Sequence, residues 1–451
     1  SPIAKKIVEV ARTQEEQCYD GTTTAIILTA ELLKKAELLL ESGVHPTTIV
    51  EGYRTAALKG KDFLTNMITD PDEDMLLAIA KTAMTGKSAE GEREHLAKLC
   101  LESVEASRPE AVHIMTRTGS PISDSFSPNG IVVGRQKIHS AMPDSLTHVK
   151  IALIDGGLEL ESFGQGVNLN LGSYNESLEY QKGRKDALKA MADHFINLGA
   201  NLVLVTKNID PWIAEYLARN NVVASRRCAA SNLEAVAQAT NGLIVSGYED
   251  LEEEDLGVAG KMEEIIQEGQ PPFMLLHDTP NNDASSLVIC APTEEVANEI
   301  RRAMDDAMGV VWVAKNDGKI VPGGSAPQVE MAHQLRNYAA SVGGRESLAV
   351  SAFAEALEIV PRTLAENAGL SPIDTLMELR KAHSSSDGKT SSMSYGLNVY
   401  TGEVVDMLAE GVIEPEKVVR QAMESATETA VMVLRIDDII SAKPPEIEDL
   451  V

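Results

Sequence analysis

The pattern of apolar residues changes twice along the chain, and this constrains the fold more than any other feature. Apolar residues recur at helical spacing from residue 1 to about 70, beginning with Ile3 and Ile7. From about residue 149 short β-type runs alternate with helical stretches, and after about residue 296 the helical spacing returns. A helical base domain interrupted by an inserted β/α domain explains this order. The length of 451 residues also suggests two or three domains.

The inserted region is predicted to contain alternating strands and helices. The predicted strands cover residues 149–154, 201–205, 222–225 and 243–245. The predicted helices between them cover residues 182–198, 209–220 and 232–240. Such alternation is typical of parallel strands joined by helical crossovers. The stretch from about 73 to 140 mixes predicted helices with predicted strands, over 75–83, 90–107, 112–115 and 130–133.

Charge and cysteine spacing exclude several classes of function. The formal net charge of −28 argues against nucleic acid and against anionic membranes as partners. No apolar run reaches the length of a membrane span. The four cysteines are scattered without CxxC or Cys/His spacing, so we expect reduced thiols in a cytoplasmic protein.

The segment from Asp20 to Thr24 is the clearest candidate for binding chemistry. Three threonines follow Gly21 and begin a long apolar helix, where unpaired N–H groups and hydroxyls can bind an anion such as phosphate. Gly21 lets the backbone come close to a ligand. Asp20 would repel bare phosphate but would hold a magnesium ion that bridges phosphate oxygens. The segment therefore indicates Mg-nucleotide binding, and the alternative is an ordinary threonine-rich helix cap with a capping aspartate.

A second candidate for close backbone approach lies at residues 319–327. There a β-type run is broken by Gly323 and Gly324 and is followed by a helical stretch. Such a break could bring the backbone near phosphate or base, although a Gly-Gly-Ser sequence by itself is usually a turn.

Seven motifs follow one another in an order that identifies a family. They are DGTTT at 20–24, KTAMTGK at 81–87, RRAMDDAM at 301–308, PGGSAP at 322–327, PRTLAE at 361–366, NAGLSPID at 367–374 and SATETAVMVLRIDD at 425–438. In these motifs the chain resembles the group II chaperonins, which are the archaeal thermosome and its eukaryotic cytosolic relatives. The resemblance covers nearly the whole chain and favours the archaeal branch.

The resemblance implies a multidomain α/β fold with three domains. They are a mainly helical equatorial domain, a small α/β intermediate domain and an inserted β/α apical domain with a helical protrusion. In chain order the expected segments are equatorial, intermediate, apical, intermediate and equatorial, at 1–72, 73–140, 141–295, 296–330 and 331–451. The protrusion corresponds to about 169–198, which also fits a simple amphipathic helix covering the β/α core.

The resemblance also implies a function. Members of the family are ATP-dependent molecular chaperones that bind and enclose unfolded polypeptides in a homo- or hetero-oligomeric double ring. ATP with Mg²⁺ is the expected ligand, and its hydrolysis would drive closure of the ring.

Site residues are carried over from the matching motifs. Asp20 corresponds to the metal ligand and shares the catalytic role with Asp306, which corresponds to the water-activating aspartate. The residues matching phosphate contacts and the glycine-rich nucleotide loop are Gly21, Thr22, Thr23, Thr24, Gly323 and Gly324. Asn398 corresponds to the position facing adenine and Glu414 to the acidic residue at the ribose. Without the resemblance, Asp306 is a solvated acidic residue, and Asn398 and Glu414 are turn and cap residues.

Three departures from the family pattern favour an alternative function. Tyr19 stands where the family has glycine, and Ser325 stands where it has a third glycine. The N-terminal part of the family's equatorial domain, with its phosphate loop, has no counterpart before Ser1. The chain could therefore be a truncated or divergent homologue that acts as a non-hydrolysing holdase or ring subunit, so ATPase activity is left open.

Overall fold

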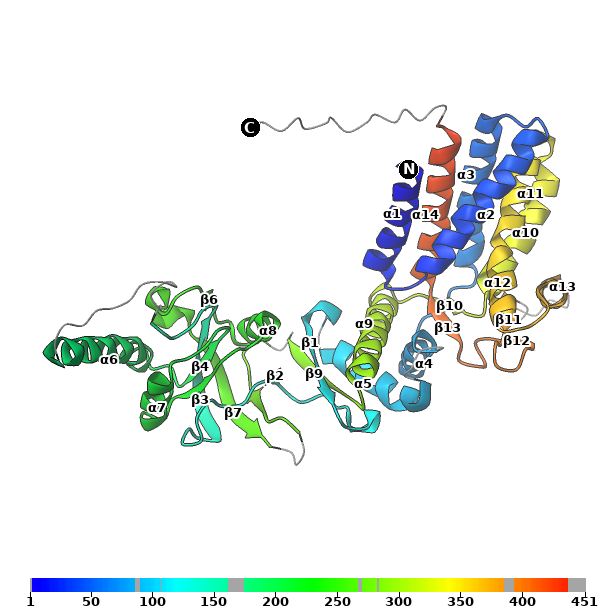
Figure 1. Cartoon of the computed structure of the whole chain (residues 1–451). Coiled ribbons are helices and arrows are strands. Elements are labelled where there is room, and N and C mark those ends of the chain that lie inside the picture. Colours follow the sequence, from blue (N-terminus) through cyan, green and yellow to red (C-terminus); the bar gives the residue numbers. More distant parts are fainter. Residues whose placement is uncertain are drawn as a thin grey trace, which may run out of the picture. The chain divides into compact units, whose positions relative to one another are not determined.

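The computed structural model describes residues 2–85, 90–106, 108–160, 174–266, 270–281, 284–384 and 393–436. It divides into two compact units, one formed by Ser1–Thr85 with Asp306–Val451 and one formed by Gly86–Asp305 (Figure 1). The ends of the KTAMTGK and SATETAVMVLRIDD motifs and residues 169–173 of the predicted protrusion lie outside the described residues. The fold is mixed α/β and mostly helical, whereas the three-domain division remains a prediction.

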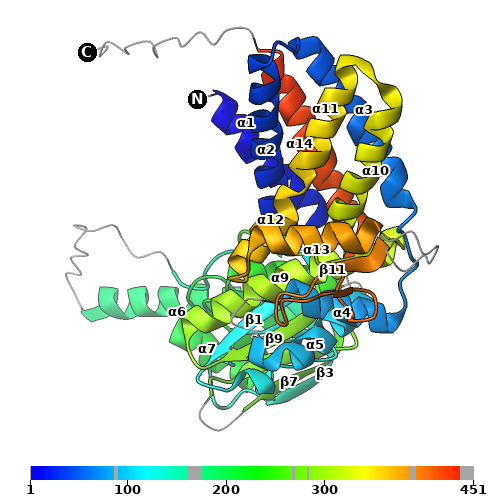
Figure 2. The same ribbon diagram turned by 90° about the vertical axis from the view of Figure 1, so that its right-hand side faces the viewer.

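The first unit is a helical bundle built from both ends of the chain. Its helices are α1 (Pro2–Cys18), α2 (Thr22–Glu41), α3 (Pro46–Thr65), α4 (Glu73–Ala83), α10 (Ala326–Val342), α11 (Gly344–Leu357), α12 (Ile359–Asn367), α13 (Pro372–Ser384) and α14 (Glu416–Leu434). Helices α2, α3, α10, α11 and α14 lie side by side (Figure 2). In their core the rings of Tyr53 and Phe353 meet edge to face, 5.6 Å apart.

Two short antiparallel ladders close one end of the helices in the first unit. Strand β10 (Ile320–Pro322) pairs with β13 (Ile413–Pro415), with Val321 opposite Glu414. Strand β11 (Tyr395–Leu397) pairs with β12 (Val404–Asp406). These pairings bring the predicted glycine loop and Glu414 to neighbouring strands, although about 90 residues separate them in the sequence.

The second unit is built around a seven-stranded sheet. Its main path is β2-β8-β7-β3-β4-β5, and β6 also pairs with β3. The strands are β2 (Ile131–Val133), β3 (Ser145–Ile154), β4 (Leu202–Val205), β5 (Val223–Ser225), β6 (Ile244–Val245), β7 (Gly257–Ile265) and β8 (Phe273–His277). The helices between them are α6 (Tyr174–Asn197), α7 (Pro211–Arg219) and α8 (Ala230–Thr240).

The predicted parallel pairing is confirmed for the four strands of the alternating region, and the sheet also contains antiparallel pairs that were not predicted. Strands β3, β4, β5 and β6 are parallel, as the alternation of strands and helices predicts. The pairs β3–β7, β7–β8 and β2–β8 are antiparallel. Only seven residues separate the end of β7 at Ile265 from the start of β8 at Phe273, which is too few for the crossover that parallel neighbours need.

A separate parallel ladder joins β1 (Val112–Thr118) to β9 (Ser285–Ala291). Helix α5 (Arg93–Ala106) packs on β9, and α9 (Glu294–Asp317) follows it in the chain. Helix α9 begins in the second unit and ends in the first unit. Asp306 is the first residue of α9 that belongs to the first unit. Within the described residues no helix combines the length and the apolar character needed to cross a bilayer.

Candidate functional site

The turn between α1 and α2 presents Asp20 at the surface of the first unit. Helix α1 ends at Cys18, and Gly21 takes a left-handed conformation with φ of 81° before α2 begins. The Asp20 carboxylate accepts a hydrogen bond from the Gly21 N–H at 2.7 Å. A Cβ at Gly21 would lie 2.8 Å from Gln14 Nε2 and 2.9 Å from Val418 Cγ1, so glycine is required sterically as well as by its φ.

The N-terminus of α2 carries the three threonines of the candidate anion site. The N-cap residue is Gly21, not Asp20, and glycine has no side chain with which to cap the first turn. Thr22 and Thr24 are half-buried, and Thr23 is exposed. A helix start with glycine at the N-cap, followed by three threonine hydroxyls, fits an anion better than it fits the alternative of a helix with aspartate at the N-cap.

Gln14 holds this turn through two hydrogen bonds, a role that was not predicted from the sequence. Its side chain is fully buried. Its amide nitrogen donates to the carbonyl of Asp20 at 2.8 Å and to the carbonyl of Val418 in α14 at 3.2 Å. Gln14 thus ties the turn at Asp20 to both terminal helices. A buried glutamine could be found from sequence only as a polar residue on the apolar face of a helix.

The glycine loop is packed too tightly for any side chain. Gly323 donates to the Val412 carbonyl at 2.8 Å, and Leu397 donates to the Gly324 carbonyl at 2.9 Å. A Cβ at Gly324, whose φ is 60°, would lie 2.6 Å from Met407 Sδ and 2.9 Å from the Leu397 carbonyl oxygen. The loop is therefore held between the β11–β12 ladder and the residues that precede β13.

Asn398 directly follows the strand that holds the glycine loop. Its side-chain oxygen accepts from the N–H groups of Tyr400 and Thr401, at 3.0 and 3.3 Å. This oxygen therefore serves a turn, as the alternative role predicts. The position next to Leu397 places Asn398 beside the glycine loop, and its contact with adenine remains a prediction.

The pKa of Glu414 is raised by the surroundings of its carboxyl group in the first unit. Its side chain is half-buried and lies on β13, opposite Val321. Burial raises the pKa of Glu414 to about 8, and the negative charge of Asp20 raises it further in the same direction. The two predicted site carboxylates thus lie near enough to interact, and Glu414 is mostly protonated at neutral pH.

Asp306 lies about one helical turn before Gly309, which contacts Tyr19. It is half-buried on α9. Three residues further along, the buried Gly309 meets the ring of Tyr19: a Cβ at Gly309 would lie 2.6 Å from Tyr19 Cβ and closer still to the ring. Tyr19 directly precedes Asp20, so the structure brings the helix of Asp306 against the segment that starts α2.

Both residues that stand in place of the expected glycines have a glycine-like backbone. Tyr19 has a φ of 58° and Ser325 a φ of 65°, each in the left-handed region that glycine adopts without strain. Both positions therefore hold a backbone conformation that favours glycine.

The residues around Asp20 fit a magnesium ion held chiefly by its ligand. No group of three or more His, Cys, Asp or Glu side chains suited to a metal occurs in the part of the chain that the structure describes. Mg²⁺ commonly takes only one or two protein carboxylates, with water and phosphate oxygens completing its coordination. The exposed Asp20, next to the N-cap residue of α2, meets that requirement.

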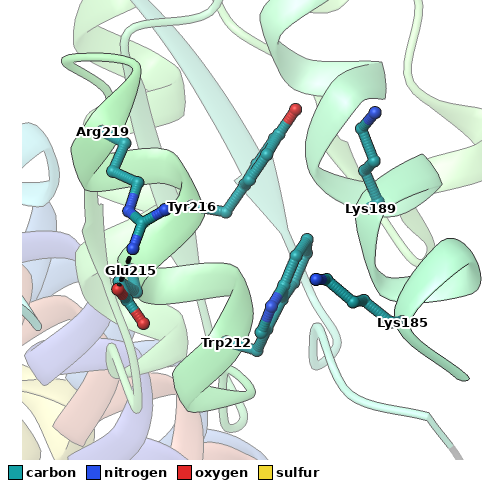
Figure 3. A pocket seen from close by; sticks show the side chains of 6 residues that line it. All are labelled: Lys185, Lys189, Trp212, Glu215, Tyr216 and Arg219. Carbon is teal, nitrogen blue, oxygen red and sulfur yellow. Dashed lines mark hydrogen bonds and ion pairs between the residues drawn. The ribbon is translucent and has the colours of Figure 1, made fainter. Parts of the chain in front are cut away.

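The second unit contains a separate cavity of about 280 Å³ between α6 and α7. The rings of Trp212 and Tyr216 stack 5.1 Å apart, and Lys185 lies over Trp212 (Figure 3). Lys189 and the ion pair between Arg219 and Glu215 complete the lining. Aromatic faces beside flexible basic side chains suit an extended polypeptide with apolar and acidic groups.

The chain belongs to the TCP-1/cpn60 chaperonin family, whose sequence model matches residues 1–444. It is a group II chaperonin subunit of the thermosome type, as the sequence predicts. It is 43% identical over 450 residues to thermosome subunit 1 of Haloferax volcanii, covering 98% of this chain and 79% of that protein. Thermosome subunit beta of Methanothermobacter thermautotrophicus is 41% identical over 448 residues, covering 98% and 82% of the two chains.

A solved structure supports the same assignment. The open-state monomer of a group II chaperonin from Methanococcoides burtonii superimposes with a TM-score of 0.73 at 37% identity. The match covers 92% of this chain and 100% of that chain. Recognition of the family from its motifs is thus confirmed, and so is the chaperonin function that follows from it.

Proposed function

We propose that this chain binds Mg-ATP in its first unit and hydrolyses it to drive the folding of polypeptides within a ring of chaperonin subunits. One observation carries the proposal. The first unit gathers the α2 N-terminus, the glycine loop, Asn398 and Glu414 from segments spread over about 400 residues. Such convergence of an anion-binding helix start with tightly packed glycines suits a nucleoside triphosphate.

The residues divide the nucleotide between them. The N–H groups and hydroxyls of Thr22, Thr23 and Thr24 would bind phosphate oxygens, and Gly21 and the Gly323–Gly324 loop would let the backbone approach. Asn398 would face the base. Glu414, being largely protonated, would offer both a donor and an acceptor to the ribose hydroxyls.

Hydrolysis would depend on Asp306. A carboxylate that orients the attacking water is a recurring part of phosphoryl hydrolysis, and Asp306 lies on a helix in contact with the Asp20 segment. When bound, Mg²⁺ would neutralise charge that develops on the phosphate oxygens, and Asp20 would hold it. Helix α9 passes from one unit to the other, so a rearrangement between them would move Asp306.

The domain names follow from the same proposal. The first unit corresponds to the equatorial domain, the sheet of β2 to β8 to the apical domain, and the β1–β9 ladder with α5 and α9 to the intermediate domain. The α6–α7 cavity would contact unfolded polypeptides, and α6 would belong to the helical protrusion. Four free, buried cysteines support the cytoplasmic location.

The second candidate is a subunit that binds nucleotide without turnover. Tyr19 favours it, because its ring occupies the side of α9 next to Asp306 and a bulky group there could keep Asp306 from the phosphate. Measured hydrolysis decides between the two functions.

The first testable prediction concerns Asp306. Asp306→Ala should retain ATP affinity in calorimetry and lose steady-state hydrolysis by about 100-fold or more, since general-base or water-orienting groups contribute on that scale. Asp305→Ala is the matched control, because this neighbouring carboxylate is exposed and pairs only loosely with Arg301, at 3.9 Å. A parallel loss of affinity and hydrolysis would contradict the assigned role, and no hydrolysis by the unaltered protein would favour the second candidate.

A further inference from the structure

The ring of Tyr19 packs against helix α9 at Gly309. The Tyr19 ring lies where a side chain at position 309 would otherwise stand, within 2.6 Å of a Cβ placed there. Gly309 is buried in the middle of α9, a position at which glycine weakens a helix. Glycine at position 309 therefore leaves the space that the Tyr19 ring occupies.

Tyr19 also holds an unfavourable backbone conformation. Its φ is 58°, which is strained for a bulky residue, while its N–H still bonds the Glu15 carbonyl at 3.0 Å and so continues α1. Strain at such a position persists only when the surroundings fix it. The Gly309 surface and the Gln14 hydrogen bond to the next residue supply that fixation.

The contact joins the two proposed catalytic elements. Tyr19 is bonded to Asp20, and Gly309 follows Asp306 by three residues, which places 306 and 309 on neighbouring parts of one helix face. Any rotation or sliding of α9 that moves Asp306 relative to Asp20 must also move Gly309 across the Tyr19 ring.

We infer that Tyr19 and Gly309 are positioning residues that set the register of α9, and hence of Asp306, against the Asp20 segment. The inference rests on the proposed ATPase function. Tyr19 then does not impair the site: its ring forms a register contact, and Gly309 leaves the space that the ring occupies. The pair should therefore affect turnover and leave nucleotide affinity nearly unchanged.

The experiment is a double-mutant cycle in the full chain. Gly309→Ala should lower kcat by about 100-fold with KM and ATP affinity nearly unaltered, because small misplacements of a reacting group cost on that order. Tyr19→Gly should lower kcat less, since it removes the ring but relieves the strain. Combining the two should restore activity relative to Gly309→Ala, because the new methyl group then has room.

A matched control separates positioning from general destabilisation. Gly52→Ala introduces the same methyl group into another tight helix contact of the first unit, 2.5 Å from the Ala349 side chain. It should reduce thermal stability and leave kcat of the folded protein unchanged. The inference would be overturned if the effects of Tyr19→Gly and Gly309→Ala were additive, or if Gly309→Ala had a normal kcat. The Asp306→Ala variant tests the ATPase function separately.

Hydrogen exchange provides a readout that does not need hydrolysis. Amides of residues 306–317 in α9 should exchange faster in Tyr19→Gly than in the unaltered protein. If the protein has no ATPase, the proposed function fails, and this comparison still decides the contact. Equal exchange in the two proteins would overturn the inference.

Discussion

At the scale of single residues, the site is dominated by two carboxylates that interact before any ligand binds. Asp20 is exposed and Glu414 is half-buried, and the charge of Asp20 helps to raise the pKa of Glu414 to about 8. A divalent cation near Asp20 would offset the negative charge of that carboxylate. Phosphate beside Asp20 is therefore favoured when it binds together with a cation.

Removal of Asp20 should remove the metal dependence of nucleotide binding. Asp20→Ala is expected to abolish the Mg²⁺-dependent part of ATP binding measured by calorimetry, because no other described residue supplies the same exposed carboxylate at the α2 N-terminus. Asp62→Ala, at an exposed carboxylate on α3, is the control. An affinity that is equal with and without EDTA in the unaltered protein would contradict the assignment.

Glu414 should make stability depend on pH in a defined window. Its pKa is about 8 in the folded protein and 4.5 in the ordinary case, so the folded state holds its proton more tightly. The resulting stability is complete below pH 4.5 and is lost as the pH rises through about 8. In urea titrations without nucleotide, Glu414→Gln should become more stable relative to the unaltered protein between pH 5 and 9. A pH-independent difference would show that Glu414 is not shifted.

At the scale of secondary-structure elements, one buried carboxylate joins four helices. Glu358 lies between α11 and α12 and is fully buried. Arg380 of α13 donates to it at 2.7 Å, and Arg336 of α10 pairs with it at 2.5 Å. Burial would raise the pKa of Glu358, but the hydrogen bonds from Arg380 and Arg336 outweigh burial and lower it.

Neutralising Glu358 should therefore destabilise the first unit. Glu358→Gln leaves two guanidinium groups without their shared charge, and breaking a buried pair costs about 3–5 kcal/mol. Denaturant unfolding would measure the loss, which should shrink below pH 4.5 as the natural carboxylate becomes protonated. Asp62→Ala, which breaks an exposed pair with Lys59, should cost less than about 1 kcal/mol. Equal costs would show that the Glu358 cluster contributes no more than a surface pair.

Local patterns in the sequence predicted the helices and strands well. Contacts between segments that are far apart in the sequence could not be predicted from such patterns. The runs at 149–154 and 201–205 and the threonine helix start are local signals, and each forms the expected element. Strand β7 contains glycines and three charged residues, and β8 has four apolar residues followed by His277, a run too short to distinguish strand from helix. Gln14 and the Tyr19–Gly309 contact depend on packing between α1, α9 and α14, which periodicity does not encode.

At the scale of the whole molecule, the insertion explains how one chain can couple nucleotide to polypeptide. The first unit contains both ends of the described chain, and residues of the candidate nucleotide site come from both of its segments. The second unit lies between those segments in sequence and contains the α6–α7 cavity. Two connections, near residues 85 and 305, therefore link the units, and one of them runs through the helix of Asp306.

The central claim is that ATP hydrolysis at the first unit drives polypeptide folding. The most direct measurement is the recovery of activity by a chemically denatured reporter enzyme mixed with the chaperonin, with and without Mg-ATP. The account predicts ATP-dependent recovery with the unaltered protein, and capture without recovery with Asp306→Ala. Recovery that is the same without ATP, or the same with Asp306→Ala, would contradict it.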